Sequence, residues 1–146
     1  MATGSNRFGT PPVEVHYQLS SGAAIGHNTD INYGTQITDN LNTYDGTTFT
    51  APYSGFYDIS AGLTLNNQTV NAGVFVGIDM YVNGSAAARL DIFESQSTTN
   101  YFQVINGSVS KFLNQGDTLT IRTNFSGGTY SFQTGVNSYV SIAKWR

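Results

Sequence analysis

An alternating stretch between residues 55 and 65 constrains this chain more than any other feature of its sequence. The segment GFYDISAGLTL turns at Gly55, and apolar side chains then fall on every second residue. The residues on the apolar side are Tyr57, Ile59, Ala61, Leu63 and Leu65. A period of two over such a length predicts a β-strand with one buried face. Phe56 is then a large aromatic residue on the face that should meet water, and the question is what that face contacts.

Further short alternating segments occupy most of the chain. They cover residues 13–19, 72–82, 88–93, 101–113, 118–125, 130–132 and 138–145. The turn dipeptides between or within them are Asn83-Gly84, Asn106-Gly107, Gly116-Asp117 and Gly127-Gly128. Asn-Gly favours a tight hairpin because both central positions of that turn adopt positive φ, so both Asn-Gly pairs predict hairpins. Roughly eight to ten short strands and no segment of helical period predict an all-β fold, an antiparallel jelly-roll sandwich.

The composition excludes several classes of function. The chain has no cysteine, which excludes disulfides, thiolate metal sites and cysteine nucleophiles. Only 10% of the residues are charged and the net charge is -3, so duplex nucleic acid and anionic membranes are poor partners. The N-terminal residues lack the apolar core of a secretory signal, and no apolar run is long enough to span a membrane. We expect no nucleic-acid or membrane partner.

The length of 146 residues fits a single domain. Residues 1–12 show no periodicity and end in Thr10-Pro11-Pro12, which favours an extended N-terminal arm and blocks entry into a helix. We expect the jelly-roll domain to span residues 13–146. Because the arm lacks the apolar content to order itself, we expect it to bind another chain, with Phe8 as the anchor and Pro11 and Pro12 as a rigid exit.

Several of these residues resemble the C1q/tumour-necrosis-factor-like jelly-roll family. In that family a Phe precedes a Gly-x-Tyr-x segment, and a Gly-Asp turn follows a later strand that ends in a bulky residue. The matching residues here are Phe49, Gly55, Tyr57, Ile59, Leu113, Gly116 and Asp117, and the chain also ends in the aromatic and aliphatic segment SYVSIAKWR. The resemblance covers residues 13–146 in order and spacing. It implies the jelly-roll fold and a phage or viral structural member of the family.

The resemblance also implies a homotrimer, with the sheet that carries the Gly-x-Tyr strand packed about the threefold axis. Phe56 and Asp58 would then face a neighbouring subunit. On the last strand Val140 and Ile142 point inward, so Tyr139, Ser141 and Ala143 would face the axis. The alternative is that Phe56 and Tyr139 are isolated surface aromatics, which are normal when they occur singly.

The sequence offers little that could support catalysis. His16 and His27 are the only histidines; neither adjoins a nucleophile motif, and both are expected to be solvated. Asp58, Asp79 and Asp91 fall at outward strand positions, and no two carboxylates are spaced as a glycosidase pair. We therefore predict no catalytic residue and no cofactor. Calcium at His27–Asp30 is the alternative, because that loop brings a His, an Asn and an Asp close together.

Three functions compete. The first is a trimeric jelly roll that decorates or cements a virion surface, as on a bacteriophage capsid, with a major capsid or other virion protein as its partner. The second is an extracellular or cell-surface module, the tip of a fibre that binds a receptor or carbohydrate, for which Tyr33, Tyr44 and Tyr53 are the loop aromatics that could stack on sugars. The third is a small glycosidase. We favour the first, because so short an arm makes us expect attachment through the domain itself.

Overall fold

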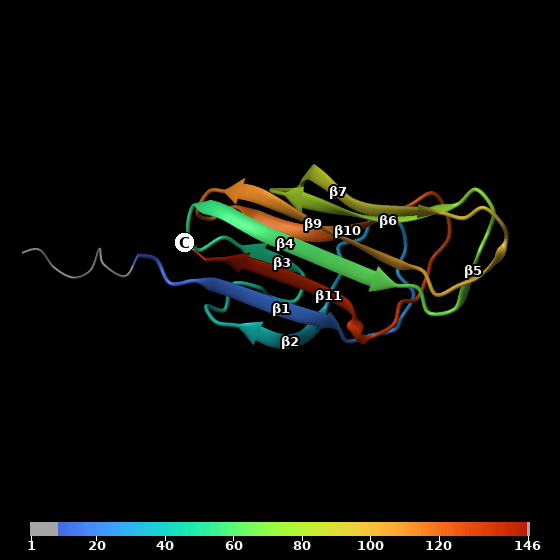
Figure 1. Cartoon of the computed structure of the whole chain (residues 1–146), viewed down its shortest axis with the longest axis horizontal. Helices are drawn as coiled ribbons and strands as arrows, with labels where there is room; N and C mark the ends of the chain where they lie inside the picture. Colours follow the sequence, from blue (N-terminus) through green and yellow to red (C-terminus); the bar gives the residue numbers. More distant parts are fainter. Residues whose placement is uncertain (1–8, 146) are drawn as a thin grey trace, which may run out of the picture.

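The computed structural model describes residues 9–145 of the chain. Within them it contains eleven strands and no helix, which confirms the predicted all-β class (Figure 1). The strands are β1 (Val13–Leu19), β2 (Gly34–Asp39), β3 (Thr48–Thr50), β4 (Gly55–Thr64), β5 (Gln68–Val70), β6 (Phe75–Val82), β7 (Ser85–Glu94), β8 (Thr99–Tyr101), β9 (Val104–Leu113), β10 (Thr118–Phe125) and β11 (Gly135–Lys144). The count exceeds the eight to ten expected because β3, β5 and β8 have only three residues each.

The strands form two sheets and a small ribbon, and every pairing is antiparallel. The order is β2-β1-β11-β4-β9 in the five-stranded sheet and β3-β10-β6-β7 in the four-stranded sheet, while β5 pairs with β8. The first and last strands are neighbours, with Val13 opposite Lys144. Both ends of the described chain therefore lie at one pole of the elongated molecule, and β5 lies at the other (Figure 1).

The core lies between the two sheets and is built from alternate residues of each strand. All five residues of the apolar side of β4 and its continuation, Tyr57 to Leu65, are at most 1% exposed, as the period of two predicts. β1 alternates buried and half-buried residues over its whole length, and β10 does the same. Each sheet therefore keeps one face for the core and presents the other outward.

The two Asn-Gly dipeptides serve different purposes. Asn83 and Gly84 have φ of 50° and 78° and form the predicted tight turn between β6 and β7. The second predicted hairpin is wrong, because β9 runs without a break through Asn106 and Gly107. A Cβ on Gly107 would overlap the backbone carbonyl of Leu90 in β7, so this glycine allows the edges of the two sheets to approach closely.

The chain enters the sandwich at the predicted position. β1 begins at Val13, and the side-chain amide of Asn40 holds the residues around it. That amide donates to the carbonyl of Pro12 at 2.8 Å and accepts from the N–H of Glu14 at 2.9 Å. Pro11 and Pro12 are exposed, whereas the predicted anchor Phe8 lies outside the described residues. The arm's partner therefore stays a prediction.

Candidate functional site

The most distinctive surface of the molecule is the outward side of the five-stranded sheet, here called the open face. The register of the sheet places Phe56 of β4 opposite Phe112 of β9, and Asp58 between Ala143 and Ser110. The five residues predicted to meet a neighbouring subunit all lie on this face: Phe56, Asp58, Tyr139, Ser141 and Ala143. The structure brings them together on two adjacent strands, β4 and β11, while their role in an interface stays a prediction.

One end of the open face is aromatic. The side chain of Phe56 is 67% exposed and packs edge-to-face against Phe112, with 5.3 Å between the ring centroids. Trp145, which follows β11 and continues its alternation, is 61% exposed. Large apolar residues are common singly on protein surfaces, but exposed aromatic residues that are neighbours in a sheet form a contiguous apolar patch. Such patches are typical of surfaces that bind another protein.

The middle of the open face is a shallow trough lined by small side chains. Ser141, Ser60 and Ser108 lie side by side on β11, β4 and β9, and Ala143 and Ser110 flank Asp58 in the next row. Because these side chains are short, they leave a depression of about 410 Å³. A depression beside an exposed aromatic patch can accept the side chains of a partner.

Tyr139 lies on the open face in the next row beyond the trough, opposite Gly62. Its ring stacks with His16 of β1, with 6.1 Å between the centroids, and crosses Gly62 of β4. A Cβ on Gly62 would lie 3.0 Å from the ring of Tyr139, so glycine makes room for the aromatic side chain. His16 is half-buried by this arrangement and lies opposite Ser141 in the ladder. The described residues show no hydrogen bond between the two side chains.

The family motif residues occupy the core behind the open face. Phe49, Tyr57 and Ile59 are buried, and the rings of Phe49 and Tyr57 meet edge-to-face at 5.5 Å. Gly55 has a φ of 152°, and a Cβ there would overlap the buried stem of Lys144. The glycine therefore allows β4 to begin beside the last residue of β11.

The predicted Gly-Asp turn is present between β9 and β10. Gly116 has a φ of 89°, and the carboxylate of Asp117 accepts the N–H of Asn114 at 2.8 Å. The same carboxylate accepts from the side chain of Asn83 at 2.9 Å, which ties this turn to the β6–β7 turn. These hydrogen bonds hold the pKa of Asp117 below its ordinary value. The motif is structural in all its described parts.

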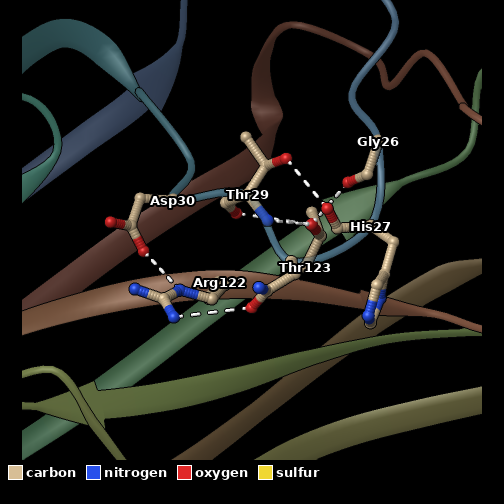
Figure 2. A network of polar contacts seen from close by, with 7 residues as sticks. Gly26, His27, Thr29, Asp30, Arg122 and Thr123 are labelled. Carbon is tan, nitrogen blue, oxygen red and sulfur yellow. Dashed lines mark hydrogen bonds and ion pairs between the residues drawn. The ribbon is translucent and has the colours of Figure 1, made fainter.

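The loop His27–Asp30, the alternative site for calcium, is joined to β10 by hydrogen bonds (Figure 2). Arg122 donates to the carboxylate of Asp30 at 2.7 Å and to the side-chain oxygen of Asn28 at 3.4 Å. The Thr123 hydroxyl donates to the carbonyl of Gly26 at 2.6 Å. His27 is exposed, as expected, and its Nδ1 also accepts the N–H of Phe125 at 3.0 Å. The loop side chains thus have structural partners, and calcium binding stays untested.

The outward side of the four-stranded sheet corrects another expectation. Asp79 is only 7% exposed rather than solvated, because Arg89 and Asn124 cover it. Arg89 donates to its carboxylate at 2.8 and 3.2 Å, and Asn124 donates at 2.8 Å. Burial alone would raise the pKa of Asp79, but these hydrogen bonds and the charge of Arg89 outweigh burial and hold the pKa below its ordinary value.

The loop tyrosines considered for sugar stacking do not form a platform. Tyr33 and Tyr44 are buried, and burial raises the pKa of both phenols. Tyr53 is half-buried, and its carbonyl accepts a hydrogen bond from the hydroxyl of Tyr57 at 2.6 Å.

Among the described residues, no group of three or more histidine, aspartate or glutamate side chains is placed to hold a metal ion. The same residues include no helix long and apolar enough to cross a membrane.

Sequence reasoning missed several residues of the open face. Ser60 shares the outward alternation of Phe56 and Asp58, and Trp145 continues the alternation of β11. Phe112, Ser108 and Ser110 join them through the register of β4 with β9. Phe112 could have been found, because Leu113 of the motif points inward and its neighbour must then point outward. The trough could not have been found, since serine at outward strand positions is ordinary.

No protein-family model and no curated protein matches the sequence, but the solved structures that match share one fold. The Eiger TNF from S. frugiperda superposes with a TM-score of 0.66 at 13% identity, covering 94% of each chain. The globular domain of zebrafish complement 1qA gives 0.63 at 11% identity, covering 93% of this chain and 97% of that one. Murine APRIL gives 0.65 at 9% identity, covering 91% and 98%. The chain therefore has the jelly-roll fold shared by TNF and complement C1q domains, over nearly its whole length.

Proposed function

We propose that the chain is a non-enzymatic module that assembles into a homotrimer through its open face. The observation that carries this proposal is the exposed pair Phe56 and Phe112 beside the trough of small side chains. Both belong to the sheet that contains the Gly55-x-Tyr57 strand, and the family resemblance leads us to expect this sheet about a threefold axis. The outward face of β4 then meets a second copy of this chain, which covers Phe56.

The energetics favour covering this face. Burying a large apolar side chain contributes about 1.5–3 kcal/mol, and Phe56, Phe112 and Trp145 together offer three such side chains in each copy. The trough supplies the complementary shape, because serine and alanine are short and lose less side-chain entropy on burial than long side chains do. Asp58, exposed at the edge of the trough, is placed to bond to polar groups of the neighbour.

A non-enzymatic role is supported by what the titratable side chains do. Asp79 and Asp30 are paired with arginines, and Asp39 accepts the N–H groups of Thr43 and Tyr44. Each of these carboxylates therefore stabilises the fold. His27 also serves a backbone group, as described above. We propose that function lies in the surface of the assembled trimer.

The trimer is tested by measuring the mass of the full chain in solution by size-exclusion chromatography with light scattering. We expect three times the chain mass of 15.7 kDa at micromolar concentration. Phe56→Asp places a charge in the interface without a partner, which costs about 3–5 kcal/mol, and should leave a folded monomer. Ile92→Asp is the matched control, because Ile92 is 41% exposed on the other sheet. That variant should remain trimeric.

A second variant guards against a folding defect in the first. Ser60→Leu fills the trough with an apolar side chain that suits the fold of a monomer but excludes the partner. It should also lower the mass. A chain that is monomeric at all concentrations, or that assembles equally well with Phe56→Asp, would contradict the proposed interface.

The finer part of the proposal is that the trimer decorates a virion surface and binds a capsid protein. Its support is compositional: 10% of the residues are charged, and the polar surface is dominated by neutral side chains, as on many viral β proteins. Deleting residues 2–10 should leave a folded trimer that no longer binds virions in co-sedimentation. If the shortened chain co-sediments as well as the full chain, the arm is not the attachment, and the fibre-tip function becomes the better explanation.

A further inference from the structure

The pole opposite the chain termini carries a pocket that the proposed trimer does not use. The pocket has a volume of about 430 Å³ and is lined by Gly22, Asn66, Phe132, Gln133 and Thr134. These residues come from the β1–β2 loop, the segment after β4 and the β10–β11 connection. Along β4, this pole is about 26 Å from Phe56 at ~3.3 Å per residue. We infer that the pocket binds a neutral carbohydrate.

The backbone around the pocket is fixed by hydrogen bonds. The N–H of Asn66 donates to the carbonyl of Ser131 at 3.2 Å, and the N–H of Gln133 donates to the carbonyl of Thr64 at 2.8 Å. The isolated bridge between Leu65 and Phe132 lies between these two bonds. The lining side chains therefore project from a framework that is already in place before a ligand arrives, which lowers the entropy lost on binding.

The chemistry of the lining is that of a site for hydroxyl groups. Asn66 and Gln133 offer side-chain amides, which both donate and accept, and Thr134 offers a hydroxyl. Asn137 donates to Oε1 of Gln133 at 2.8 Å, which orients the amide so that its NH₂ group can bind a ligand oxygen. The described residues that line the pocket include no lysine, arginine or carboxylate, so charged ligands lack the partner that they require.

An exposed aromatic residue, Phe102, lies across the strand pair from Asn66, which lines the pocket. The N–H of Leu65 donates to the carbonyl of Gln103 at 2.9 Å, so the antiparallel register places Phe102 next to Asn66. Phe102 is 60% exposed. The apolar face of a sugar ring stacks on an aromatic ring while its hydroxyls bond to nearby amides, and Phe102, Asn66 and Gln133 supply both kinds of contact.

The test is binding of the full chain to an array of neutral hexose and N-acetylhexosamine oligosaccharides, with sialylated and sulfated glycans on the same surface. We expect binding to a neutral glycan and titrate that glycan against the variants. Phe102→Ala and Gln133→Ala should each weaken binding about tenfold, whereas Phe102→Tyr should retain it. Gln115→Ala is the matched control, because Gln115 is an exposed amide in the turn between β9 and β10.

Each result bears on the inference separately from the trimer. Absence of binding to every neutral glycan, or binding of the anionic glycans alone, would overturn the carbohydrate site. If Gln133→Ala leaves glycan binding unchanged, the carbohydrate does not bind in this pocket. The solution mass of each variant is measured in parallel: if Phe102→Ala dissociates the trimer, Phe102 belongs to the subunit interface and is lost from the site. A trimer that binds no glycan would leave the proposed function intact and remove this inference alone.

Discussion

The outward faces of the two sheets differ in whether their side chains have partners within the chain. On the four-stranded sheet, Arg89 pairs with Asp79, and Arg122 pairs with Asp30 while lying 4.0 Å from the centre of the Tyr81 ring. Polar groups there bond to one another. On the open face, Phe56 and Phe112 are exposed beside a trough of serines. No salt bridge joins side chains of that face in the part of the chain that the structure describes.

The difference shows how a chain with few charges distributes them. Both salt bridges among the described residues involve β10 or its neighbour β6, on the four-stranded sheet or the loop beside it. A face whose polar groups are already satisfied gains little from a partner, since each new contact must replace an existing one. The open face has apolar surface that none of the described residues 9–145 covers. Attachment to another copy is therefore expected on one side of the sandwich only.

The largest expected effect comes from forcing apart the edges of the two sheets, which would destroy both faces at once. In Gly107→Val, the new side chain overlaps the backbone carbonyl of Leu90, which cannot rotate away. We expect the free energy of unfolding to fall by about 3 kcal/mol or more, the upper range for overpacking. Chemical denaturation followed by intrinsic fluorescence measures the loss.

The matched control for this variant is Gly127→Val. A Cβ on Gly127 meets no atom within 4 Å, and its φ lies outside the left-handed region. Stability should change little there, by about 0.5 kcal/mol or less. Equal losses in the two variants would mean that the cost is a general one of replacing glycine in a strand or turn, and that Leu90 and Gly107 do not close the sandwich.

A smaller effect distinguishes the two faces directly, because each carries one strand aspartate. Asp79→Ala removes the hydrogen bonds that a buried carboxylate makes with Arg89 and Asn124, so the free energy of unfolding should fall by about 1–3 kcal/mol. Asp58→Ala removes an exposed carboxylate and should change it by no more than about 0.5 kcal/mol. Urea denaturation at a protein concentration where both variants are monomeric makes the comparison. The reverse order of effects would show that the open face is the one stabilised internally.

The smallest expected effect is in acid. The pKa of Asp79 in the folded chain lies below its ordinary value of 3.8, so its pairing stabilises the fold fully above that value. The contribution is lost as the pH falls through the folded pKa, because both states are then protonated. Asp79→Asn should therefore flatten part of the decline in stability below about pH 4. The decline that persists includes the contribution of Asp117, whose pKa is also lowered. If stability falls with pH equally steeply in Asp79→Asn and in the unchanged chain, Asp79 does not contribute to the loss of stability in acid.

The fold class and the facing of the strands could be read from the sequence because alternation is a local property. It predicted β1 with the same bounds as the structure and placed Phe56 and Tyr139 on the open face. Partners across strands are not local. The second Asn-Gly pair was interpreted as a turn because the approach of Leu90 to Gly107 is a tertiary contact. For the same reason, alternation gave the direction of Asp79 but not the Arg89 that covers it.

Loops were the other source of error. Tyr33 and Tyr44 lie between predicted strands, yet both are buried under the end of the sandwich. The ring of Tyr44 packs edge-to-face on Tyr17 at 4.6 Å. The sequence pattern therefore separates strands from loops better than it separates buried loop residues from exposed ones. The trough on the open face depends on three strands from distant parts of the chain, so it required the register of the whole sheet.

The position of β11 has a consequence for the order in which the chain acquires its structure. β11 lies between β1 and β4, so the five-stranded sheet cannot form until residues 135–144 have been synthesised. Until then the first strand has no neighbour on that side, and the apolar sides of β1 and β4 stay accessible to water and to other nascent chains. Contacts between residues so far apart slow folding to the range of milliseconds to seconds. The five-stranded sheet therefore forms only after β11 has been added, and a chain that ends at residue 134 should be digested by protease under conditions that the full chain survives.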